Sequence, residues 1–151
     1  FRLHTAASPH VAAQIDGVDM GLNDFTPPDS TRLLIETAGG VMSPMTSQHT
    51  VADVVAHQGW ATALVVQHYL GSINHTLAAI ESLRARGVNL IGLIVNGESN
   101  ADSEQFICDY AHIRVLVRIP FLPTLNRDSI SHAAHGLRAQ LPPELTPWIT
   151  P

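Results

Sequence analysis

Residues 61–96, ATALVVQHYLGSINHTLAAIESLRARGVNLIGLIVN, decide the fold, because they contain the pattern of a strand, a helix and a second strand. The strands expected at 61–67 and 90–96 are apolar throughout, which is typical of strands buried on both faces. Between them, apolar side chains recur on one face of a helix expected at 73–86, and Gly87 is its stop signal. This order predicts two parallel strands joined by a right-handed crossover.

The same alternation extends on both sides of this unit. Ser8 and Pro9 open a helix to about residue 15, and Thr50 with Asp53 forms a capping box for a helix that Gly59 closes. The other expected elements are a strand at 33–36, a helix capped by Asp102 or Ser103 that runs to 111, a strand at 115–120 and a helix at 128–141. We therefore predict a single α/β domain over residues 1–151, with three layers, a mostly parallel sheet with helices on both faces, and a Pro-rich tail at 142–151.

Composition excludes several classes of protein. The chain has 151 residues, 45% apolar content and a formal charge of -5, and its arginines are scattered singly, so no nucleic-acid footprint is expected. The apolar runs are too short to span a bilayer, and no signal peptide opens the chain. A single cysteine, Cys108, fits a reducing compartment and reads as an inert packing residue. We expect a cytoplasmic protein.

The carboxyl ends of the strands are where a parallel sheet binds ligands. The segment LGSINHT (70–76) leaves N–H groups unpaired at a helix start, which suits a carboxylate or phosphate, although taken alone the segment favours an ordinary cap at Ser72. Asn96 ends a strand and has an amide that can pair with a purine edge, or it belongs to a turn. Glu36, before Gly39 and Gly40, suits metal or phosphate work, with an ion pair as the alternative.

Two absences limit the chemistry. A phosphate-binding loop of the form G-x-x-x-x-G-K-[ST] needs a lysine, and this chain contains none. The chain also begins at Phe1 rather than at methionine, so we expect a missing N-terminal piece.

Among nine histidines, His132 and His135 lie one helical turn apart, but no third ligand has a recognisable spacing, so we interpret them as solvent-side or packing residues. Trp60 and Trp148 are expected to be structural.

Five segments together resemble one family, the dethiobiotin synthetases. The segment LIETAGGVMSPM (34–45) resembles their E-G-A-G-G-x-x-x-P-L motif, and HYLGSINHTL (68–77) is similar to their L-G-C-I-N-H-x-L motif. SPHVAA (8–13) matches their S-P-H-x-A-A helix, and IVN (94–96) followed by RIPFL (118–122) matches their adenine-side strand ends. Order and spacing agree over nearly the whole chain.

The resemblance implies a P-loop NTPase-like fold and ATP- and Mg²⁺-dependent closure of the ureido ring of 7,8-diaminopelargonate with CO₂, in biotin synthesis. Glu36 would act in catalysis as a magnesium ligand, and Gly39 would let substrate and phosphate approach the backbone. The residues implied to hold the substrate carboxylate, across a homodimer interface, are Leu70, Ser72, Ile73 and Asn74. Those implied to face adenine are Asn96, Pro120, Phe121 and Leu122.

This chain departs from the family pattern at two places. Thr37 stands where the family usually has glycine, which would stiffen the turn. The family's first strand and P-loop, its active-site lysines and a magnesium-binding aspartate would lie upstream of Phe1, and a separate segment that carries them would be a partner of this chain. We therefore expect the isolated chain to be inactive and, with apolar sheet surface uncovered, to associate. The alternative is a non-catalytic binding or interaction module. A third possibility is membership of a related family such as the cobyrinate synthetases, and the LGSINH segment argues against it.

Overall fold

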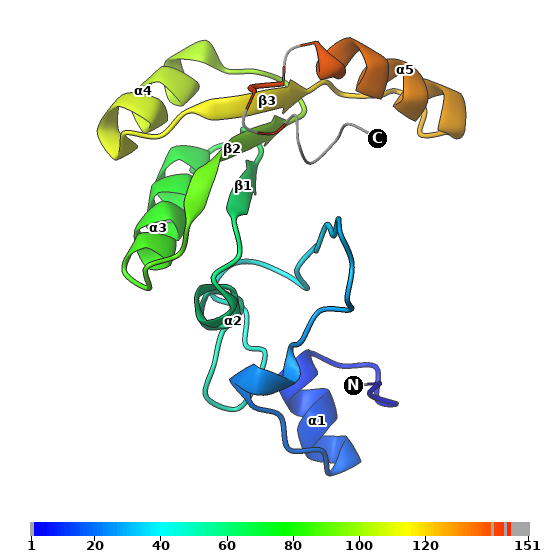
Figure 1. Cartoon of the computed structure of the whole chain (residues 1–151). Helices are drawn as coiled ribbons and strands as arrows, with labels where there is room; N and C mark the ends of the chain where they lie inside the picture. Colours follow the sequence, from blue (N-terminus) through cyan, green and yellow to red (C-terminus); the bar gives the residue numbers. More distant parts are fainter. Residues whose placement is uncertain (1, 140, 144, 146–151) are drawn as a thin grey trace. The chain divides into compact units, whose positions relative to one another are not determined.

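A computed structural model describes residues 2–139, 141–143 and 145 of the chain. Its elements alternate between helices and parallel strands from residue 51 onward (Figure 1). In chain order they are α1 (Pro9–Asp16), the 3-10 helix η1 (Leu22–Asp24), α2 (Val51–Gln58), β1 (Thr62–Val66), α3 (Ser72–Arg84), β2 (Leu90–Asn96), α4 (Ala101–Ala111), β3 (Val115–Ile119) and α5 (Arg127–Arg138). They fall into two compact units, residues 1–61 with 81–89 and residues 62–80 with 90–151. The single-domain organisation stays a prediction.

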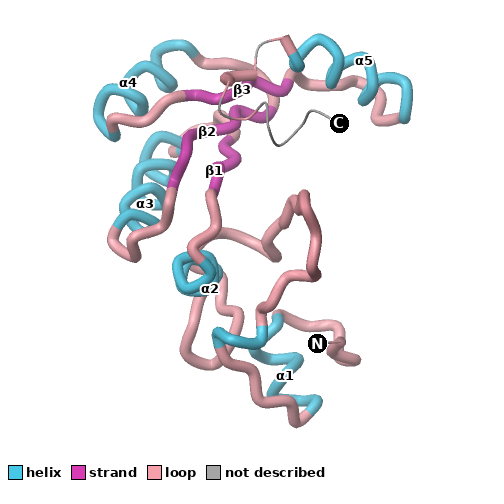
Figure 2. The backbone as a smooth tube through the Cα atoms, in the orientation of Figure 1, coloured by secondary structure: helices cyan, strands magenta, loops and turns pink. Residues whose placement is uncertain are grey.

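The second unit contains a three-stranded parallel sheet in the order β1-β2-β3 (Figure 2). The predicted fold class, a parallel sheet with helices in the connections, is confirmed. Gly92 is needed where β2 approaches β3, because a Cβ there would lie 2.5 Å from Cγ of Leu116. At the carboxyl ends of the strands, Asn96 on β2 pairs with Ile119 on β3.

The core of the second unit joins the sheet to α3 and α4. Leu93 and Val95 of β2 pack with Ile80 of α3 and Ile107 of α4, and all four are almost fully buried. On β1, Val66 belongs to this core, whereas Val65 is 59% exposed. The alternation along β1 therefore places one of its faces against the helices.

The first unit is held by helix caps and one ion pair. The expected capping box at the start of α2 is confirmed, with Thr50 and Asp53 bonded reciprocally, and Gly59 closes the helix in the left-handed conformation. The Nε atom of Arg86 donates to Oδ1 of Asp53 at 2.7 Å. This contact ties the segment 81–89 to α2.

Three sequence predictions on element bounds are wrong. Residues 33–36 form no strand, and Leu34 is 96% exposed, because none of the described residues pairs with this segment as a strand neighbour. The cap of α4 is Asn100 rather than Asp102 or Ser103, since its side chain accepts the Ser103 N–H. Helix α5 ends at Arg138 rather than at 141. Trp148 and most of the Pro-rich tail lie outside the described residues.

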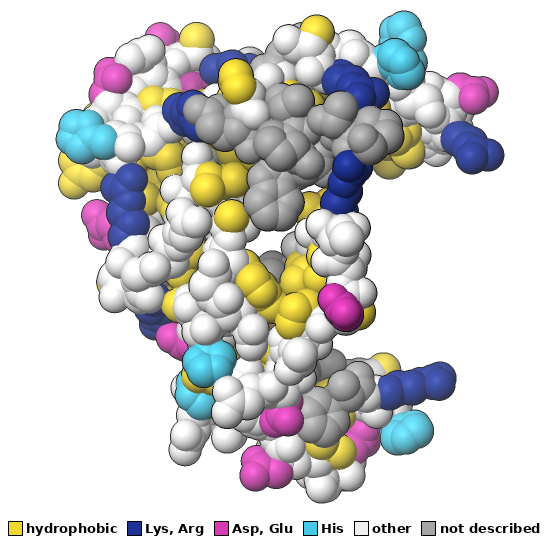
Figure 3. Space-filling view, in the orientation of Figure 1, with side chains coloured by type: hydrophobic (Ala, Val, Ile, Leu, Met, Phe, Trp, Pro, Cys, Tyr) yellow, Lys and Arg dark blue, Asp and Glu magenta, His cyan; other side chains and the backbone are white. Residues whose placement is uncertain are grey.

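Hydrophobic side chains are open to solvent on the face in view in Figure 3. The most exposed of those that the structure describes are Leu34, Leu70, Phe121 and Leu125, each more than 70% exposed. Association of the isolated chain through such surface stays a prediction. No helix within the described ranges has the length and apolar character needed to cross a membrane.

Candidate functional site

The start of α3 presents free backbone donors. The helix begins at Ser72, as expected for the first turn of the LGSINHT segment. The Ser72 N–H donates to the Tyr69 carbonyl at 2.9 Å, and the His75 N–H donates to the Gly71 carbonyl at 3.1 Å. Within the part of the chain that the structure describes, the N–H groups of Ile73 and Asn74 have no acceptor. A helix start with free donors and a positive dipole end is suited to an anion.

The segment before α3 is held by a ring pair. The Tyr69 hydroxyl lies 2.8 Å from Nδ1 of His75, and the two ring centroids are 5.7 Å apart. Gly71, which lies between them in the sequence, has a φ of 94°, a backbone conformation that residues with a Cβ atom rarely adopt. Leu70 is fully exposed, and Ser72 is buried. The polar backbone of the turn is therefore fixed, while an apolar side chain beside it is left open.

The ends of β2 and β3 bring the predicted adenine-side residues together. Asn96 is opposite Ile119, and the Gly97 N–H donates to the Ile119 carbonyl at 2.8 Å. Pro120 therefore follows directly beside Asn96 at the edge of the sheet. Asn96 is exposed and Phe121 is 72% exposed. An amide next to an open aromatic ring and backbone offers both stacking and hydrogen bonds to a flat base.

Glu36 and Gly39 belong to the first unit, on the loop that leads to α2. Gly39 has a φ of 93°, and a Cβ at this position would lie 2.6 Å from Oγ of Ser43, so glycine is required. The loop is fastened to the helix, since the N–H of Val51 donates to the carbonyl of Ser43 at 2.9 Å. Glu36 itself is exposed. The glycine turn is thus rigidly placed, and the carboxylate before it is accessible.

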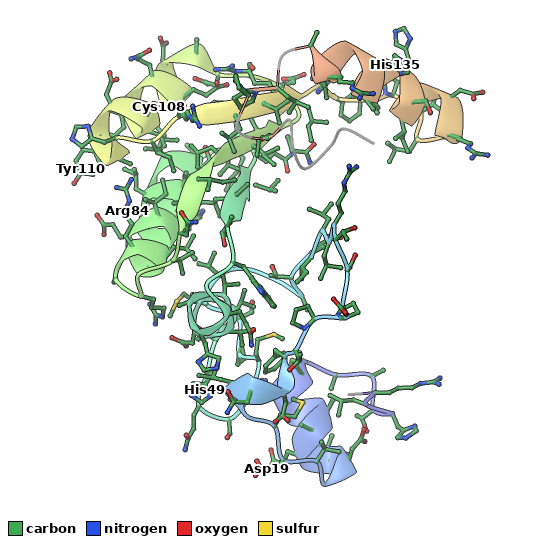
Figure 4. All side chains as sticks on the ribbon, viewed as in Figure 1. Asp19, His49, Arg84, Cys108, Tyr110 and His135 are labelled. Atoms are coloured by element: carbon green, nitrogen blue, oxygen red, sulfur yellow. The ribbon has the colours of Figure 1, made fainter. Side chains whose placement is uncertain are left out.

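The donor set limits what metal this part of the chain can hold. No group of three His, Cys, Asp or Glu side chains suited to a metal ion occurs among the described residues. Mg²⁺, however, is commonly held by one or two carboxylates together with phosphate oxygens and water. Glu36 fits that role as one ligand of a nucleotide-bound ion, and it does not form a metal site alone. His132 and His135 are exposed, as expected, and His135 points away from α5 (Figure 4).

A buried charge cluster was missed by the sequence interpretation. Glu104, in the first turn of α4, is 5% exposed and accepts from Nε and Nη2 of Arg118 at 2.7 and 2.6 Å. Its other oxygen accepts from the Asn100 N–H at 3.2 Å and faces Nε2 of His68 at 3.3 Å. A signal for it was present, because Arg118 is the only charged residue of β3.

The electrostatics of the cluster favour an ionised carboxylate. Burial raises the pKa of Glu104, but hydrogen bonds and the charge of Arg118 outweigh it, so that the pKa is lower than usual. On the same helix, burial raises the pKa of the Cys108 thiol, because the hydrogen bond from the Val115 backbone and the charge of Arg118 offset its effect only in part. The interpretation of Cys108 as an inert packing residue agrees with this shift.

Comparison with known proteins gives a consistent result. The family described as AAA domain matches residues 1–129. An ATP-dependent dethiobiotin synthetase of a Bradyrhizobium species is 42% identical over 135 residues, which cover 88% of this chain and 64% of that protein. The namesake enzyme of Rhodopseudomonas palustris is 45% identical over 136 residues, with 88% and 63% covered. That of Novosphingobium aromaticivorans is 42% identical over 141 residues, with 93% and 68% covered. The chain thus spans less than 70% of the length of these relatives.

Proposed function

Because the chain belongs to the dethiobiotin synthetase family of AAA-domain proteins, we propose that it serves the ATP- and Mg²⁺-dependent closure of the ureido ring of 7,8-diaminopelargonate with CO₂. In this reaction the two amino groups of the substrate are joined through one carbonyl carbon, and ATP supplies the driving force. The residues of this chain bind and orient the reactants. The observation that carries the proposal is the open start of α3, directly after β1.

The start of α3 holds the carboxylate of 7,8-diaminopelargonate in this proposal. The donors are the free N–H groups of Ile73 and Asn74 with the side chains of Ser72 and Asn74, and Leu70 contacts the carbon chain of the substrate. A carboxylate at a helix start gains roughly 0.3 to 2 kcal/mol from the dipole and its N–H groups. Binding of the distant carboxylate orients the reacting amino groups without touching them.

The adjacent strand ends hold the base of ATP. The Asn96 side chain pairs with the edge of adenine, and the segment Pro120–Leu122 supplies backbone groups and the exposed ring of Phe121. Support comes from the pairing of β2 with β3, which puts these residues at one edge of the sheet. The start of α3 comes shortly after the carboxyl end of β1 in the same sheet. The residues proposed to bind the base and the substrate carboxylate therefore belong to one unit of the chain.

The proposal also gives roles to Glu36 and Gly39, which lie in the first unit. Glu36 is one ligand of the Mg²⁺ that accompanies ATP, and when bound the ion offsets the negative charge of the phosphates. Gly39 keeps the backbone free of side-chain bulk where phosphate and substrate approach. Support comes from the tight contact that any Cβ at this position would make with Ser43.

A homodimer and a cytoplasmic location are part of the proposal. Leu70 is fully exposed and Tyr69 is 57% exposed, and both adjoin the start of α3. A second protomer that covers these side chains would remove apolar surface from water and enclose the carboxylate site. The phosphate-binding lysine of this proposal lies in a P-loop segment outside the 151 residues, because none of these residues is a lysine.

Calorimetric titration of the protein with 7,8-diaminopelargonate tests the carboxylate site. We expect binding that is lost for the methyl ester of the same compound, since the ester removes only the negative charge. Equal affinity for acid and ester would contradict the assignment. Dilution to monomer should weaken binding of the acid if the site is shared between protomers.

Turnover measurements separate the enzyme from a non-catalytic module, the alternative that the absence of lysine favours. With diaminopelargonate, bicarbonate, Mg²⁺ and ATP, we expect no turnover from this chain alone and turnover once a segment with the P-loop is added. In the restored enzyme, Glu36→Gln should remove most activity and weaken the dependence on Mg²⁺. Turnover by the chain alone would refute the first expectation, and no turnover with the added segment would favour the module.

A further inference from the structure

We propose that Glu104 is a positioning residue, which with Arg118 and His68 holds the segment before α3 against the ends of β2 and β3. In this arrangement the carboxylate site and the base site keep one relative geometry. The proposal deepens the proposed function and rests on it for the identity of the two ligands. The contacts themselves are independent of any ligand.

The contacts of Glu104 come from three parts of the sheet edge. Arg118 on β3 binds Oε2 through Nε and Nη2, at 2.7 and 2.6 Å. The Asn100 N–H, in the loop after β2, donates to Oε1 at 3.2 Å. His68, in the segment after β1, contacts Oε1 through Nε2 at 3.3 Å. One carboxylate, 5% exposed, therefore joins the carboxyl ends of all three strands.

The position of the hydrogen on the His68 ring follows from this contact. Arg118 keeps Glu104 ionised, so the carboxylate has no proton to donate, and Nε2 must carry the hydrogen of the pair. The other ring nitrogen, Nδ1, is buried and has no partner among the described residues. Buried polar atoms are normally paired, because leaving them unpaired is unfavourable. The position of the imidazole therefore gives Glu104 a hydrogen bond through Nε2, while Nδ1 is left without one.

The placement of His68 reaches the carboxylate site through a short segment. Three residues separate it from Ser72, and one of them, Tyr69, is tied to His75 on the first turn of α3. The segment 68–71 is therefore fixed on one side to α4 through Glu104 and on the other side to α3. Without the His68 contact, the free N–H groups of Ile73 and Asn74 would keep their helix but lose a fixed position against Asn96.

Two amide substitutions separate the two nitrogens of the imidazole. In His68→Gln the side-chain amide reaches the place of Nε2 and keeps a donor for Glu104. In His68→Asn the amide reaches only the place of Nδ1, so the Glu104 contact is lost while the residue stays polar. His132→Asn, at an exposed position of α5, is the matched control for loss of an imidazole.

Amide hydrogen exchange of the ligand-free protein tests the positioning role. We expect exchange of the hydrogen-bonded amides of Ser72 and His75 to rise about tenfold in His68→Asn, and to stay within about twofold of the wild type in His68→Gln and in the control. Equal exchange in all four proteins would overturn the proposal. Imidazole ¹⁵N shifts give a second readout, with a hydrogen expected on Nε2 of His68; a bare Nε2 would also overturn it.

Ligand titrations then connect the cluster to the two sites. His68→Asn should weaken 7,8-diaminopelargonate and leave ADP within about twofold, whereas Glu104→Gln, which affects all three strand ends, should weaken both ligands. Unchanged affinities in both variants would count against positioning. If the wild type binds neither ligand, the proposed function fails, and the exchange experiment still decides the role of Glu104.

Discussion

The starts of α2 and α3 differ in how their backbone donors are satisfied. Before α2, Thr50 supplies a cap oxygen and Asp53 returns the bond, while the N–H groups of Val51 and Ala52 donate to backbone carbonyls of the preceding loop. Before α3 stands Gly71, which has no side chain to accept a bond, and the third helical residue is Asn74 in place of an acid. The first end is closed, and the second keeps free N–H donors.

The comparison teaches that a helix start keeps free N–H groups only where neither a capping pair nor the preceding loop supplies acceptors for them. Both helices follow glycine-containing loops, and both have the same partial positive charge at the end. In α2 the carboxylate of Asp53 already occupies that end. In α3 the corresponding place is open, so exchanging the third residue should convert one kind of end into the other.

Asn74→Asp is the substitution with the largest expected effect. A carboxylate at the third position, where α2 has Asp53, would place a negative charge at the start of α3 and repel the substrate carboxylate. We expect affinity for 7,8-diaminopelargonate to fall about thirtyfold or more, roughly 2 kcal/mol, with ADP binding nearly unchanged. Calorimetry with both ligands provides the measurement. Unaltered diaminopelargonate affinity would show that this end is not the carboxylate site.

Asp53→Asn tests the closed end and should act on stability. The change weakens the capping box and the ion pair with Arg86, so we expect the free energy of unfolding to fall by about 1 to 2 kcal/mol. Urea denaturation provides the measurement, and diaminopelargonate affinity should not change. A loss of substrate affinity without a loss of stability would reverse the assignment of the two helix ends.

The dependence of this effect on pH follows from the pKa of Asp53. The Thr50 side chain, the Thr50 N–H and Arg86 lower the pKa of Asp53 from 3.8 to about 2. A carboxyl with a depressed folded-state pKa stabilises fully above its unfolded value, and the stabilisation is lost as pH falls through the folded value. The stability difference between wild type and Asp53→Asn should therefore shrink between pH values of about 4 and 2. A stability difference that does not change with pH would show that the ionised Asp53 carboxylate is not its cause.

Asn74→Ala has the smallest expected effect. It removes the side-chain amide and leaves the backbone donors and the helix dipole in place. We expect diaminopelargonate affinity to fall about threefold to tenfold, with ADP binding nearly untouched. Equal losses for both ligands would point to a disturbed sheet edge instead of a lost contact. Comparing the losses of diaminopelargonate affinity in Asn74→Asp and Asn74→Ala then shows how much of the binding comes from backbone donors and how much from the Asn74 side chain.

Much of the second unit was predictable because its signals are local. The apolar runs of β2 and β3, the glycine that stops α3 and the Gly71–Ser72 start each depend on a few neighbouring residues. The capping box of α2 is equally local. Residues 33–36 show the limit of this reasoning, since an apolar run becomes a strand only when another strand pairs with it, and no described residue does so.

By itself the sequence determined the parallel αβ pattern, the family resemblance and the identity of the residues at the strand ends. Only the tertiary structure decided that Glu104, His68 and Arg118 meet, because they lie in three segments joined solely by the folded sheet. It also decided that the start of α3 is open while that of α2 is closed. Periodicity and capping act between near neighbours in the chain, whereas buried charges are paired by contacts that no local pattern records.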